Sequence, residues 1–438
     1  MITDFIEDLK EDIERATTVE YLGKVDRVVG MSIEAIGPMV NVGEMCKIYS
    51  ADESEWVFAE VVGFKEEKVL LMPLGNMEGI GAGNKVVAAG VGFGVPVGMD
   101  LKGRILNALG EPIDNKGKVH PETFYELDRD PPNPLKRERI HEILPIGVKV
   151  IDGLLTMGKG QRMGIFAGSG VGKSTLMGMI ARGSDADINV IVLCGERGRE
   201  VLDFVEKSLK ADGLARSVVV VATSDQPAML RIKSCMTGTA IAEYFRDQGY
   251  NVMLMMDSLT RFAMAQREVG MAVGEPPVAR GYTPSVYSKL PRLLERSGTS
   301  DKGSITAIYT VLVDGDDMNE PISDTVRGIL DGHIVLSRKL AHSNHYPAID
   351  ALASISRLMA DIASPEHKAD AGQVKNWMST YNEAQDLINI GAYKKGTNPE
   401  IDMAIKKQDA IKNFLLQDVD DAFTFEETVD MLDEIANG

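Results

Sequence analysis

A glycine-rich segment holds residue types that bind phosphate, and its sequence is Ala167-Gly-Ser-Gly-Val-Gly-Lys-Ser-Thr175. An apolar run precedes it and a helical pattern follows, which is the strand, turn and helix context of a P-loop. Glycines let backbone N–H groups close around phosphate oxygens, and the following helix offers its partly positive N-terminus. The general motif begins with glycine where this chain has Ala167, so Gly168 and Gly170 are expected to supply the flexibility. A chance glycine turn is the alternative.

The P-loop predicts a site for a nucleoside triphosphate with Mg²⁺. Lys173 is expected to reach the β- and γ-phosphates, and the Ser174 hydroxyl is expected to bind the metal. The residues expected to contact the nucleotide are Gly168, Ser169, Gly170, Val171, Gly172, Lys173, Ser174 and Thr175.

Two acids end later apolar runs and complete the candidate site. Asp257 ends the run that begins at Asn251, and we expect it to bind Mg²⁺ through water. An aspartate here could also cap the next helix, and the two roles are compatible. Glu196 ends the run that begins at Ile188, where its carboxylate can orient and polarise the water that attacks the γ-phosphate. The alternative for Glu196 is a solvated acid paired with Arg197 or Arg199.

The elements that must position these residues follow a strand and helix alternation from Gly90 onward, which predicts a parallel sheet covered by helices. Ligands of such sheets bind beyond the carboxyl ends of the strands, where Glu196 and Asp257 stand. The expected core strands are Met163–Phe166, Val190–Cys194, Ser217–Ala222, Val252–Asp257, Thr306–Val313 and Gly332–Leu336.

The two flanks of this core have different patterns. From about Tyr21 to Val87, short β runs broken by glycine and proline indicate a small barrel. After about Ser364 helical spacing dominates. The expected barrel strands are Gly23–Val29, Met39–Asn41, Met45–Tyr49, Trp56–Phe64 and Lys68–Leu74.

Composition excludes several classes of protein. The chain has 438 residues, and 47 Lys and Arg against 65 Asp and Glu give a net charge of −18, which disfavours binding to nucleic acid over most of the surface. Three scattered cysteines provide no disulfide framework and no zinc site. The acidic N-terminus is unlike a secretory signal, and the apolar runs are far shorter than a membrane span. We therefore expect a cytoplasmic protein.

The motifs, taken in order, resemble the ATP synthase α/β family of rotary-type ATPases. The matching segments are Ala167–Thr175, Gly195–Arg199, Asp257 and the family's signature segment, Pro347–Ser356. Within the family, the chain is most similar to the ATPases of flagellar type III export, with the injectosome ATPases next. That similarity rests on Ala167–Ser174, Gly274–Val286, Pro291–Gly298 and Asp316–Ile322. The resemblance extends from Leu22 to Ile405.

The resemblance implies an α/β fold with a RecA-like P-loop parallel sheet core, an N-terminal β-barrel and a C-terminal helical domain. The expected domains are an amphipathic helix at 1–18, the barrel at 19–92, the ATPase domain at 93–365 and the helical domain at 366–438.

The resemblance also assigns roles residue by residue. Glu196 matches the family's catalytic glutamate, which is glutamine in noncatalytic subunits, and Arg197 matches the arginine that follows it. Arg357 matches the arginine finger that reaches a neighbouring subunit's site, although it could be a surface arginine on a helix. Tyr346 matches the aromatic residue that packs on adenine, although it could be a buried structural tyrosine. With Lys173, these residues imply ATP hydrolysis with Mg²⁺.

The implied function is ATP hydrolysis that energises type III export of flagellar components by a homohexameric ring at the inner face of the cell membrane. The implied partners are a stator-like regulatory subunit at the N-terminal helix, a coiled-coil stalk in the pore, chaperone and substrate complexes at the C-terminal domain, and the membrane export gate. The loop Glu275–Ser285 is expected to face the pore, or it is a plain structural loop. No nucleic-acid partner is expected.

Three alternative functions remain at this point. An injectosome ATPase would use the same chemistry with other partners. An RNA translocase of the transcription-terminator kind would need a basic N-terminal module, which this chain lacks. A scaffold subunit without turnover is disfavoured by Glu196. The amphipathic stripes at 2–15 and at Phe425, Val429, Leu432 and Ile435 either bind partners or pack on their own chain.

Overall fold

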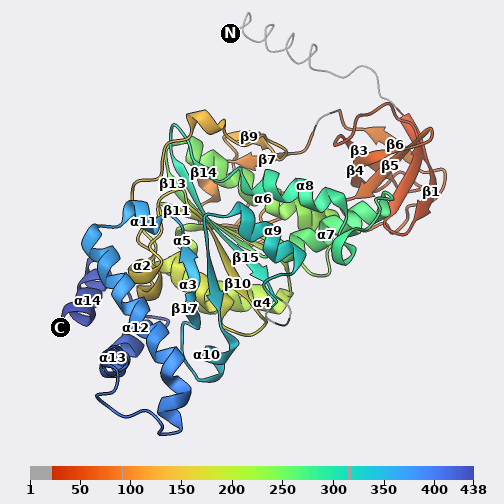
Figure 1. The fold of residues 1–438 in the computed structure, drawn as a ribbon. Coiled ribbons are helices and arrows are strands. Elements are labelled where there is room, and N and C mark those ends of the chain that lie inside the picture. The colour runs from red at the N-terminus through yellow and green to blue at the C-terminus, as the bar shows by residue number, and fades with distance from the viewer. Residues whose placement is uncertain (1–21, 91, 314, 316) are drawn as a thin grey trace, which may run out of the picture. The chain divides into compact units, whose positions relative to one another are not determined.

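A computed structural model describes residues 22–90, 92–313, 315 and 317–438 (Figure 1). The chain divides into two compact units: one contains the residues up to Phe93 together with Glu268–Glu275, and the other contains Gly94–Arg267 and Pro276–Gly438. The amphipathic helix expected at 2–15 lies outside the described residues. Within the described ranges, no helix has the length and apolar character needed to span a membrane.

The first unit contains a closed barrel whose strands follow the order β1, β2, β5, β4, β3, β6. Its strands alternate between inward apolar residues and outward residues, so Val25, Ile33, Ile48, Val61 and Leu71 form a buried core. The strands are β1 (Leu22–Val29), β2 (Ser32–Ile36), β3 (Met45–Tyr49), β4 (Trp56–Lys65), β5 (Lys68–Pro73) and β6 (Lys85–Ala88).

One expected barrel strand is wrong. Met39–Asn41 is not a strand, because Pro38 provides no N–H for a ladder and the chain then turns, with Glu44 N donating to Asn41 O at 3.1 Å. Two barrel strands are missing from the expectation: β6, which has only four residues, and β2. Its alternation is hidden in the sequence because four of its five residues are buried.

The second unit contains a nine-stranded sheet in the order β17, β16, β10, β15, β13, β11, β12, β8, with β14 paired to β15. All pairs are parallel except β16 with β17 and β14 with β15. The six expected core strands are confirmed. The strands are β8 (Ile105–Asn107), β10 (Arg162–Ala167), β11 (Ile188–Glu196), β12 (Ser217–Thr223), β13 (Asn251–Asp257), β14 (Gly298–Thr299), β15 (Ser304–Leu312), β16 (Gly332–Leu336) and β17 (Ile349–Ser356). A separate ribbon pairs β7 (Gly94–Val97) with β9 (Thr123–Glu126).

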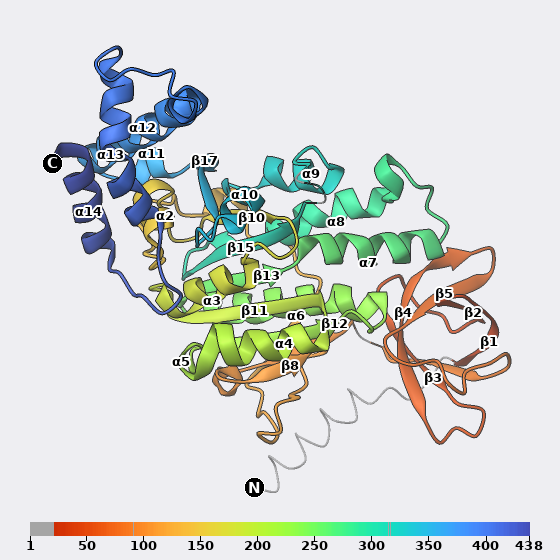
Figure 2. The same ribbon diagram turned by 90° about the horizontal axis from the view of Figure 1, so that it is seen from below.

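Helices cover both faces of this sheet (Figure 2). Side chains alternate along β11, so Ile191 and Leu193 pack with Leu176 of α3, whereas Val192 faces Gly238 of α6. The helices are α2 (Lys149–Leu154), α3 (Lys173–Gly183), α4 (Gly198–Asp203), α5 (Lys210–Ala215), α6 (Ala228–Asp247), α7 (Leu259–Ala272), α8 (Pro284–Leu294), α9 (Pro321–Ile329), α10 (Arg338–His342) and α11 (Met359–Ile362).

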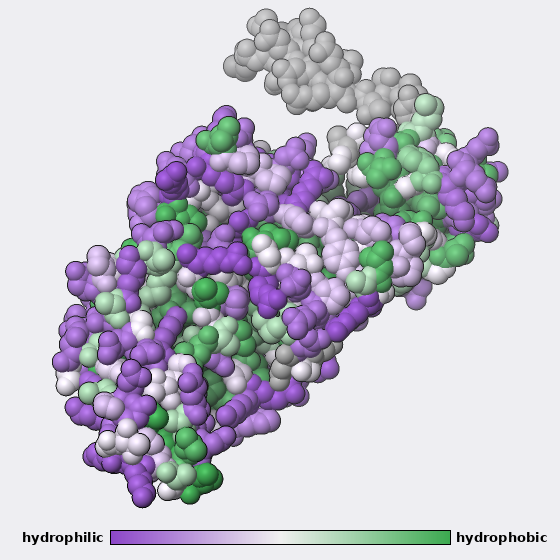
Figure 3. Space-filling model, in the orientation of Figure 1, coloured by the Kyte–Doolittle hydropathy of each residue, from purple (hydrophilic) through white to green (hydrophobic). Residues whose placement is uncertain are grey.

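The chain ends in three helices that pack on one another and on α2. They are α12 (Pro365–Asn389), α13 (Pro399–Leu415) and α14 (Phe425–Asn437). Leu432 and Ile435 of α14 are buried in the same core cluster as Phe414 of α13 and Trp377 of α12. Of the two alternatives for the apolar stripe of α14, partner binding and packing on its own chain, the structure shows packing on its own chain. Hydrophilic residues dominate the face visible in Figure 3, with apolar patches scattered among them.

Candidate nucleotide-binding site

The P-loop links the end of β10 to the start of α3. Gly170 and Gly172 have φ values of +77° and +91°, which residues with a side chain rarely adopt. A Cβ on Gly170 would meet nothing within 4 Å, so the loop leaves open space at this point. Gly172 is the N-cap of α3 and offers no capping side chain, so the first N–H groups of this 11-residue helix are available to an anion.

Lys173, Glu196 and Asp257 come together at the carboxyl edge of the sheet, as expected. The Lys173 Nζ lies 2.5 Å from Asp257 Oδ1 and 3.8 Å from Glu196 Oε1. Thr310 on β15 donates to Asp257 Oδ1 at 2.7 Å and fixes the carboxylate from the far side. A single ammonium thus contacts two acids, which the neighbouring strands β11 and β13 deliver to one place.

The pKa of Glu196 is raised to about 7. Burial is the largest cause, the negative charge of Asp257 adds to it, and a hydrogen bond with Glu200 raises it further, while Lys173 opposes these effects. Burial alone would lower the pKa of Lys173, but the carboxylates of Asp257 and Glu196 raise it. Lys173 is therefore a permanent cation here, whereas Glu196 can change its protonation near neutral pH.

The two arginines after Glu196 point away from this cluster. Arg197 pairs with Glu200 at 3.3 Å and Arg199 with Asp203 at 3.7 Å, and both arginine side chains are at least 80% exposed. Glu196 is therefore not the solvated partner of these arginines. The structure does not bring Arg197, an expected catalytic residue, to the phosphate loop of its own chain.

A cavity of about 590 Å³ adjoins the P-loop, and Tyr346 lines it together with Gly172 and Thr175. The Tyr346 ring is 40% exposed and lies 3.5 Å from the position of a Cβ on Gly172. This tyrosine is therefore not a buried structural residue. The loop after α13 also lines the cavity, and Gln417 N of this loop donates to Tyr346 O at 3.1 Å. The loop contributes Leu416, Gln417, Asp418, Val419 and Asp421.

Arg357 lies at the other edge of the sheet. Ser356 pairs with Gly332 at the start of β16, whereas Leu336 at the end of β16 pairs with Ala167 beside the P-loop. The four residue steps from Gly332 to Leu336 span about 13 Å of strand, which exceeds the reach of an arginine side chain. Arg357 is exposed, and it follows a strand rather than standing on a helix.

The side chains at the P-loop fit a magnesium ion held together with phosphate. Ser174 and Asp257 offer hydroxyl and carboxylate oxygens, the hard ligands that Mg²⁺ prefers. Among the described residues no group of three or more His, Cys, Asp or Glu side chains could hold a metal by itself. Mg²⁺ keeps water and substrate phosphates in its coordination shell.

Sequence reasoning missed Thr310 and the wall from Leu416 to Asp421. Thr310 is an ordinary residue of an apolar strand, and only the adjacency of β13 and β15 brings it to Asp257. The loop lies more than 200 residues from the P-loop and contains no motif. The side-chain amide of Gln417 holds this loop in place: it donates to Gly147 O at 2.9 Å and accepts from Lys149 N at 2.9 Å.

Family models match three consecutive parts of the chain. The nucleotide-binding domain of the ATP synthase alpha/beta family matches residues 147–356, and the beta-barrel domain of that family matches 25–90. The flagellum-specific ATP synthase of Bacillus subtilis is 56% identical over 420 residues, which cover 95% of each chain. The chain belongs to the ATP synthase alpha/beta family. It is an ATPase with a nucleotide-binding core, and the C-terminal domain model of the type III secretion ATPase EscN matches residues 363–434.

Relatives of this ATPase come from both export systems. The type 3 secretion system ATPase of Xanthomonas euvesicatoria is 51% identical over 98% of this chain and 97% of its own. The assembled EscN of enteropathogenic E. coli, a solved structure, has a TM-score of 0.89 at 47% identity and covers 94% of this chain and 100% of EscN. A second structure, of EscN in complex with its central stalk EscO, has a TM-score of 0.87. The expected barrel, parallel sheet and helical domain are confirmed.

Proposed function

We propose that this ATPase hydrolyses ATP to energise type III export of flagellar components, working as a homohexameric ring with its active sites between neighbouring copies. The observation that carries the proposal is the division of catalytic groups within one chain. Lys173, Glu196 and Asp257 meet at one edge of the sheet, whereas Arg357 stands at the other. Each copy therefore offers one half of a site to each neighbour.

In the proposed reaction the P-loop holds the phosphates, and Lys173 turns from Asp257 and Glu196 to the β- and γ-phosphates. Glu196, once ionised, orients the attacking water and accepts its proton. Mg²⁺ held by Ser174 and, through water, by Asp257 would neutralise phosphate charge. Tyr346 packs on the adenine in the adjoining cavity. Arg357 of the neighbouring copy stabilises the charge that develops on the γ-phosphate.

Phosphate release by the purified wild type and by Glu196→Gln tests the hydrolytic role. We expect Glu196→Gln to lose turnover by about 10²- to 10⁴-fold, the range for a general base, while it still binds a fluorescent ATP analogue. Arg199→Gln is the matched control, because it changes an exposed side chain in the first turn of α4, three residues after Glu196. Equal turnover in Glu196→Gln and wild type contradicts the proposed role.

A mixing experiment tests the shared site. Glu196→Gln and Arg357→Ala chains are each expected to be nearly inactive alone, but mixed rings contain interfaces with an intact Glu196 and an intact Arg357. Activity should pass through a maximum near equal proportions. Pull-down between two differently tagged variants verifies that mixed rings form, and mixed rings without recovered activity contradict the shared site.

The proposed partners follow the family. EscN forms a complex with its central stalk EscO, and we propose an equivalent coiled-coil stalk for this chain, with Glu275–Ser285 facing the pore. We also propose a regulatory subunit at the N-terminal helix, chaperone and substrate complexes at the C-terminal helices, and contact with the export gate from the cytoplasmic side of the membrane. Deletion of the gene should abolish flagellar filaments, and motility microscopy measures this.

The second candidate is an injectosome ATPase, favoured by the 51% identity to the Xanthomonas protein. Retained filaments together with loss of injectosome secretion in the deletion strain would favour this candidate. The hydrolytic site is common to both.

A further inference from the structure

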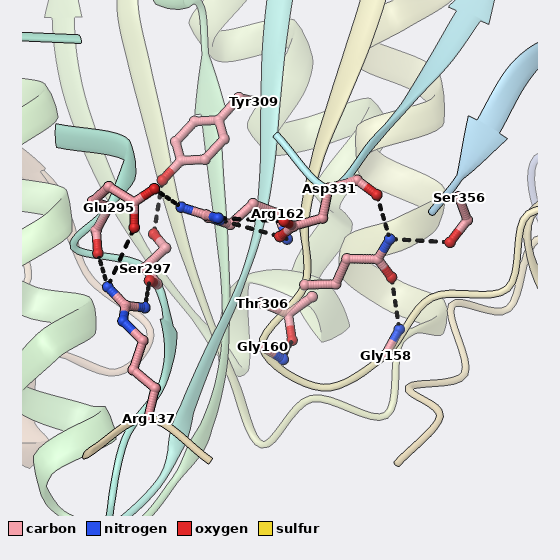
Figure 4. Close-up of polar contacts among 11 residues, drawn as sticks. Arg137, Gly158, Gly160, Arg162, Glu295, Ser297, Thr306, Tyr309, Asp331 and Ser356 are labelled. Carbon is pink, nitrogen blue, oxygen red and sulfur yellow. Dashed lines mark hydrogen bonds and ion pairs between the residues drawn. The ribbon is translucent and has the colours of Figure 1, made fainter. Parts of the chain in front are cut away.

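Asp331, which lies between α9 and β16, is held to the start of β10 by several bonds (Figure 4). Its carboxylate accepts hydrogen bonds from Arg162 N at 3.0 Å, Nε at 3.1 Å and Nη2 at 3.3 Å. Its own N–H donates to Arg162 O at 2.9 Å. A bidentate arginine–carboxylate pair fixes the orientation of the two side chains as well as the distance between them. Asp331 therefore has little freedom to move relative to β10.

The backbone carbonyl of the same residue holds the base of Arg357. Arg357 N donates to Asp331 O at 3.0 Å, and Gln161 Nε2 donates to the same oxygen at 3.2 Å. Gln161 Nε2 also bonds the Ser356 hydroxyl at 3.0 Å, and that hydroxyl donates to Thr156 O at 2.8 Å. The backbone at the end of β17 is therefore fixed through Asp331, while the exposed Arg357 side chain makes one hydrogen bond, from Nη2 to Arg327 O at 3.3 Å.

Arg162 is held from its other side by the end of α8. Its Nη1 lies 2.5 Å from Glu295 Oε1, so one guanidinium stands between two carboxylates, as Figure 4 shows. Arg137 donates to the carbonyls of Glu295 and Ser297, and the Ser297 hydroxyl bonds the buried Tyr309 hydroxyl at 2.7 Å. The Arg162 side chain is only 15% exposed. Loss of either carboxylate leaves a mostly buried cation less well paired.

We propose that Asp331 is a positioning residue for Arg357, holding the base of the finger in the geometry that the neighbouring copy's site requires. Arg162 transmits this constraint, and Glu295 connects it to α8, the helix that begins at the end of the segment Glu275–Ser285. The inference rests on the proposed function, in which Arg357 acts between copies. Displacement of a catalytic group by about 1 Å can lower the rate about 100-fold, so a rigid base for a long side chain has a direct effect on turnover.

Steady-state kinetics of Asp331→Asn test this role. The substitution keeps size and backbone but removes the charge that pairs with Arg162. Because ATP binds to the P-loop at the other edge of the sheet, we expect kcat to fall at least about 10-fold with KM for ATP nearly unchanged. Asp301→Asn is the matched control, since it removes an exposed carboxylate at the same edge of the sheet. Unchanged kcat in folded Asp331→Asn rings overturns the inference.

Mixed rings distinguish positioning of the finger from a general structural defect. Asp331→Asn mixed with Glu196→Gln should regain activity, because some interfaces then combine an intact finger half with an intact Glu196. Asp331→Asn mixed with Arg357→Ala should not regain activity, because both substitutions damage the half of the site that contains Arg357. Recovery in both mixtures, or in neither while Glu196→Gln with Arg357→Ala recovers, overturns the role of Asp331 but leaves the shared site standing. Failure of that last mixture contradicts the shared site itself.

Arg162→Lys provides a second route if Asp331→Asn does not fold. Lysine cannot form the bidentate pair with Asp331, so the constraint is lost. Because lysine keeps the positive charge, we expect this variant to disturb the fold less than Asp331→Asn does. The same pattern is expected: lower kcat, unchanged KM, and recovery with Glu196→Gln only. Wild-type kcat in this variant overturns the inference.

Discussion

The surroundings of Glu196 determine the pKa of its carboxyl group. Glu196 stands at the end of a buried strand beside a second carboxylate, and Lys173 contacts both carboxylates. An exposed glutamate has a pKa well below neutral pH, so its side chain would already be ionised at about pH 7. Burial and Asp257 instead raise the pKa of Glu196 to about 7, so near neutral pH the carboxylate is partly ionised and is a stronger proton acceptor than an exposed glutamate.

The rate should depend on pH through this group. Because the pKa is raised, Glu196 is mostly protonated below about pH 7 and ionised above it. We expect kcat/KM for ATP hydrolysis to rise with pH through about 7 and then level, since this quantity reports the free enzyme. Initial rates of phosphate release between about pH 6 and 8 measure the profile. A flat profile in that range contradicts Glu196 as the base.

Glu200 provides a finer check of the same group. Its carboxylate accepts a hydrogen bond that favours protonated Glu196, and its negative charge acts in the same direction. Glu200→Ala should therefore lower the pKa of Glu196 and move the acidic limb of the profile to lower pH. Asp203→Ala, on the same helix, is the control and should leave the limb in place. A limb that does not move in Glu200→Ala shows that another group titrates.

At the scale of elements, the close packing of α6 on β11 supports the strand that delivers Glu196. A Cβ on Gly238 would lie 2.1 Å from Val192 Cγ2, well inside any real contact. Valine has few rotamers, and both residues are buried where α6 packs on β11, so the helix has to move. This glycine is required by a close approach of two elements, not by its backbone angles.

Gly238→Ala should destabilise the protein by about 1–3 kcal/mol, the usual cost of overpacking a core. Gly372→Ala is the control, because Gly372 lies in α12 with nothing within 4 Å of the added Cβ. There the better helix propensity of alanine should stabilise the protein by up to about 1 kcal/mol. Denaturant unfolding followed by circular dichroism measures both, and equal effects of the two substitutions contradict the packing argument.

At the scale of the whole molecule, no single chain holds a complete site in the proposed function. Lys173 and Arg357 stand at opposite edges of one sheet, so a chain by itself has phosphate contacts without the finger. We therefore expect assembly to control activity, so that a free chain consumes little ATP before it assembles.

Specific activity should therefore rise with protein concentration. We expect the wild type to show low activity per chain when dilute and a plateau once rings form. Arg357→Ala should assemble equally but stay about 10³-fold less active at the plateau. Phosphate release measured beside mass photometry tests both, and constant activity per chain across the assembly transition contradicts a shared site.

The acidic ends give a further prediction. Residues 1–22 contain seven acids and two bases, and residues 418–438 contain eight acids and no base. Deletion of residues 2–15 should leave ATP hydrolysis intact and abolish co-purification of the proposed regulatory subunit. A scrambled version of residues 2–15 keeps the charge but loses the apolar face and should also fail to bind. Retained binding after the deletion contradicts a docking role for this segment.

The six core strands and the P-loop could be predicted from the sequence because their signals are local. An apolar run of five or six residues, or a glycine that must adopt positive φ, is constrained by its own neighbours in the chain. The expected strand Met39–Asn41 failed where proline and a turn interrupted such a run, and β2 was missed because its residues are buried almost without alternation.

The sequence by itself therefore determined the chemistry of this protein: a phosphate loop, a lysine, and two acids at strand ends. Only the tertiary structure decided which distant side chains meet. Thr310 reaches Asp257 because β13 lies beside β15, the loop after α13 closes the cavity at Tyr346, and Asp331 holds the base of Arg357. Strand order and helix docking depend on packing across the whole chain, and the periodicity of a single segment carries no information about its neighbours in space.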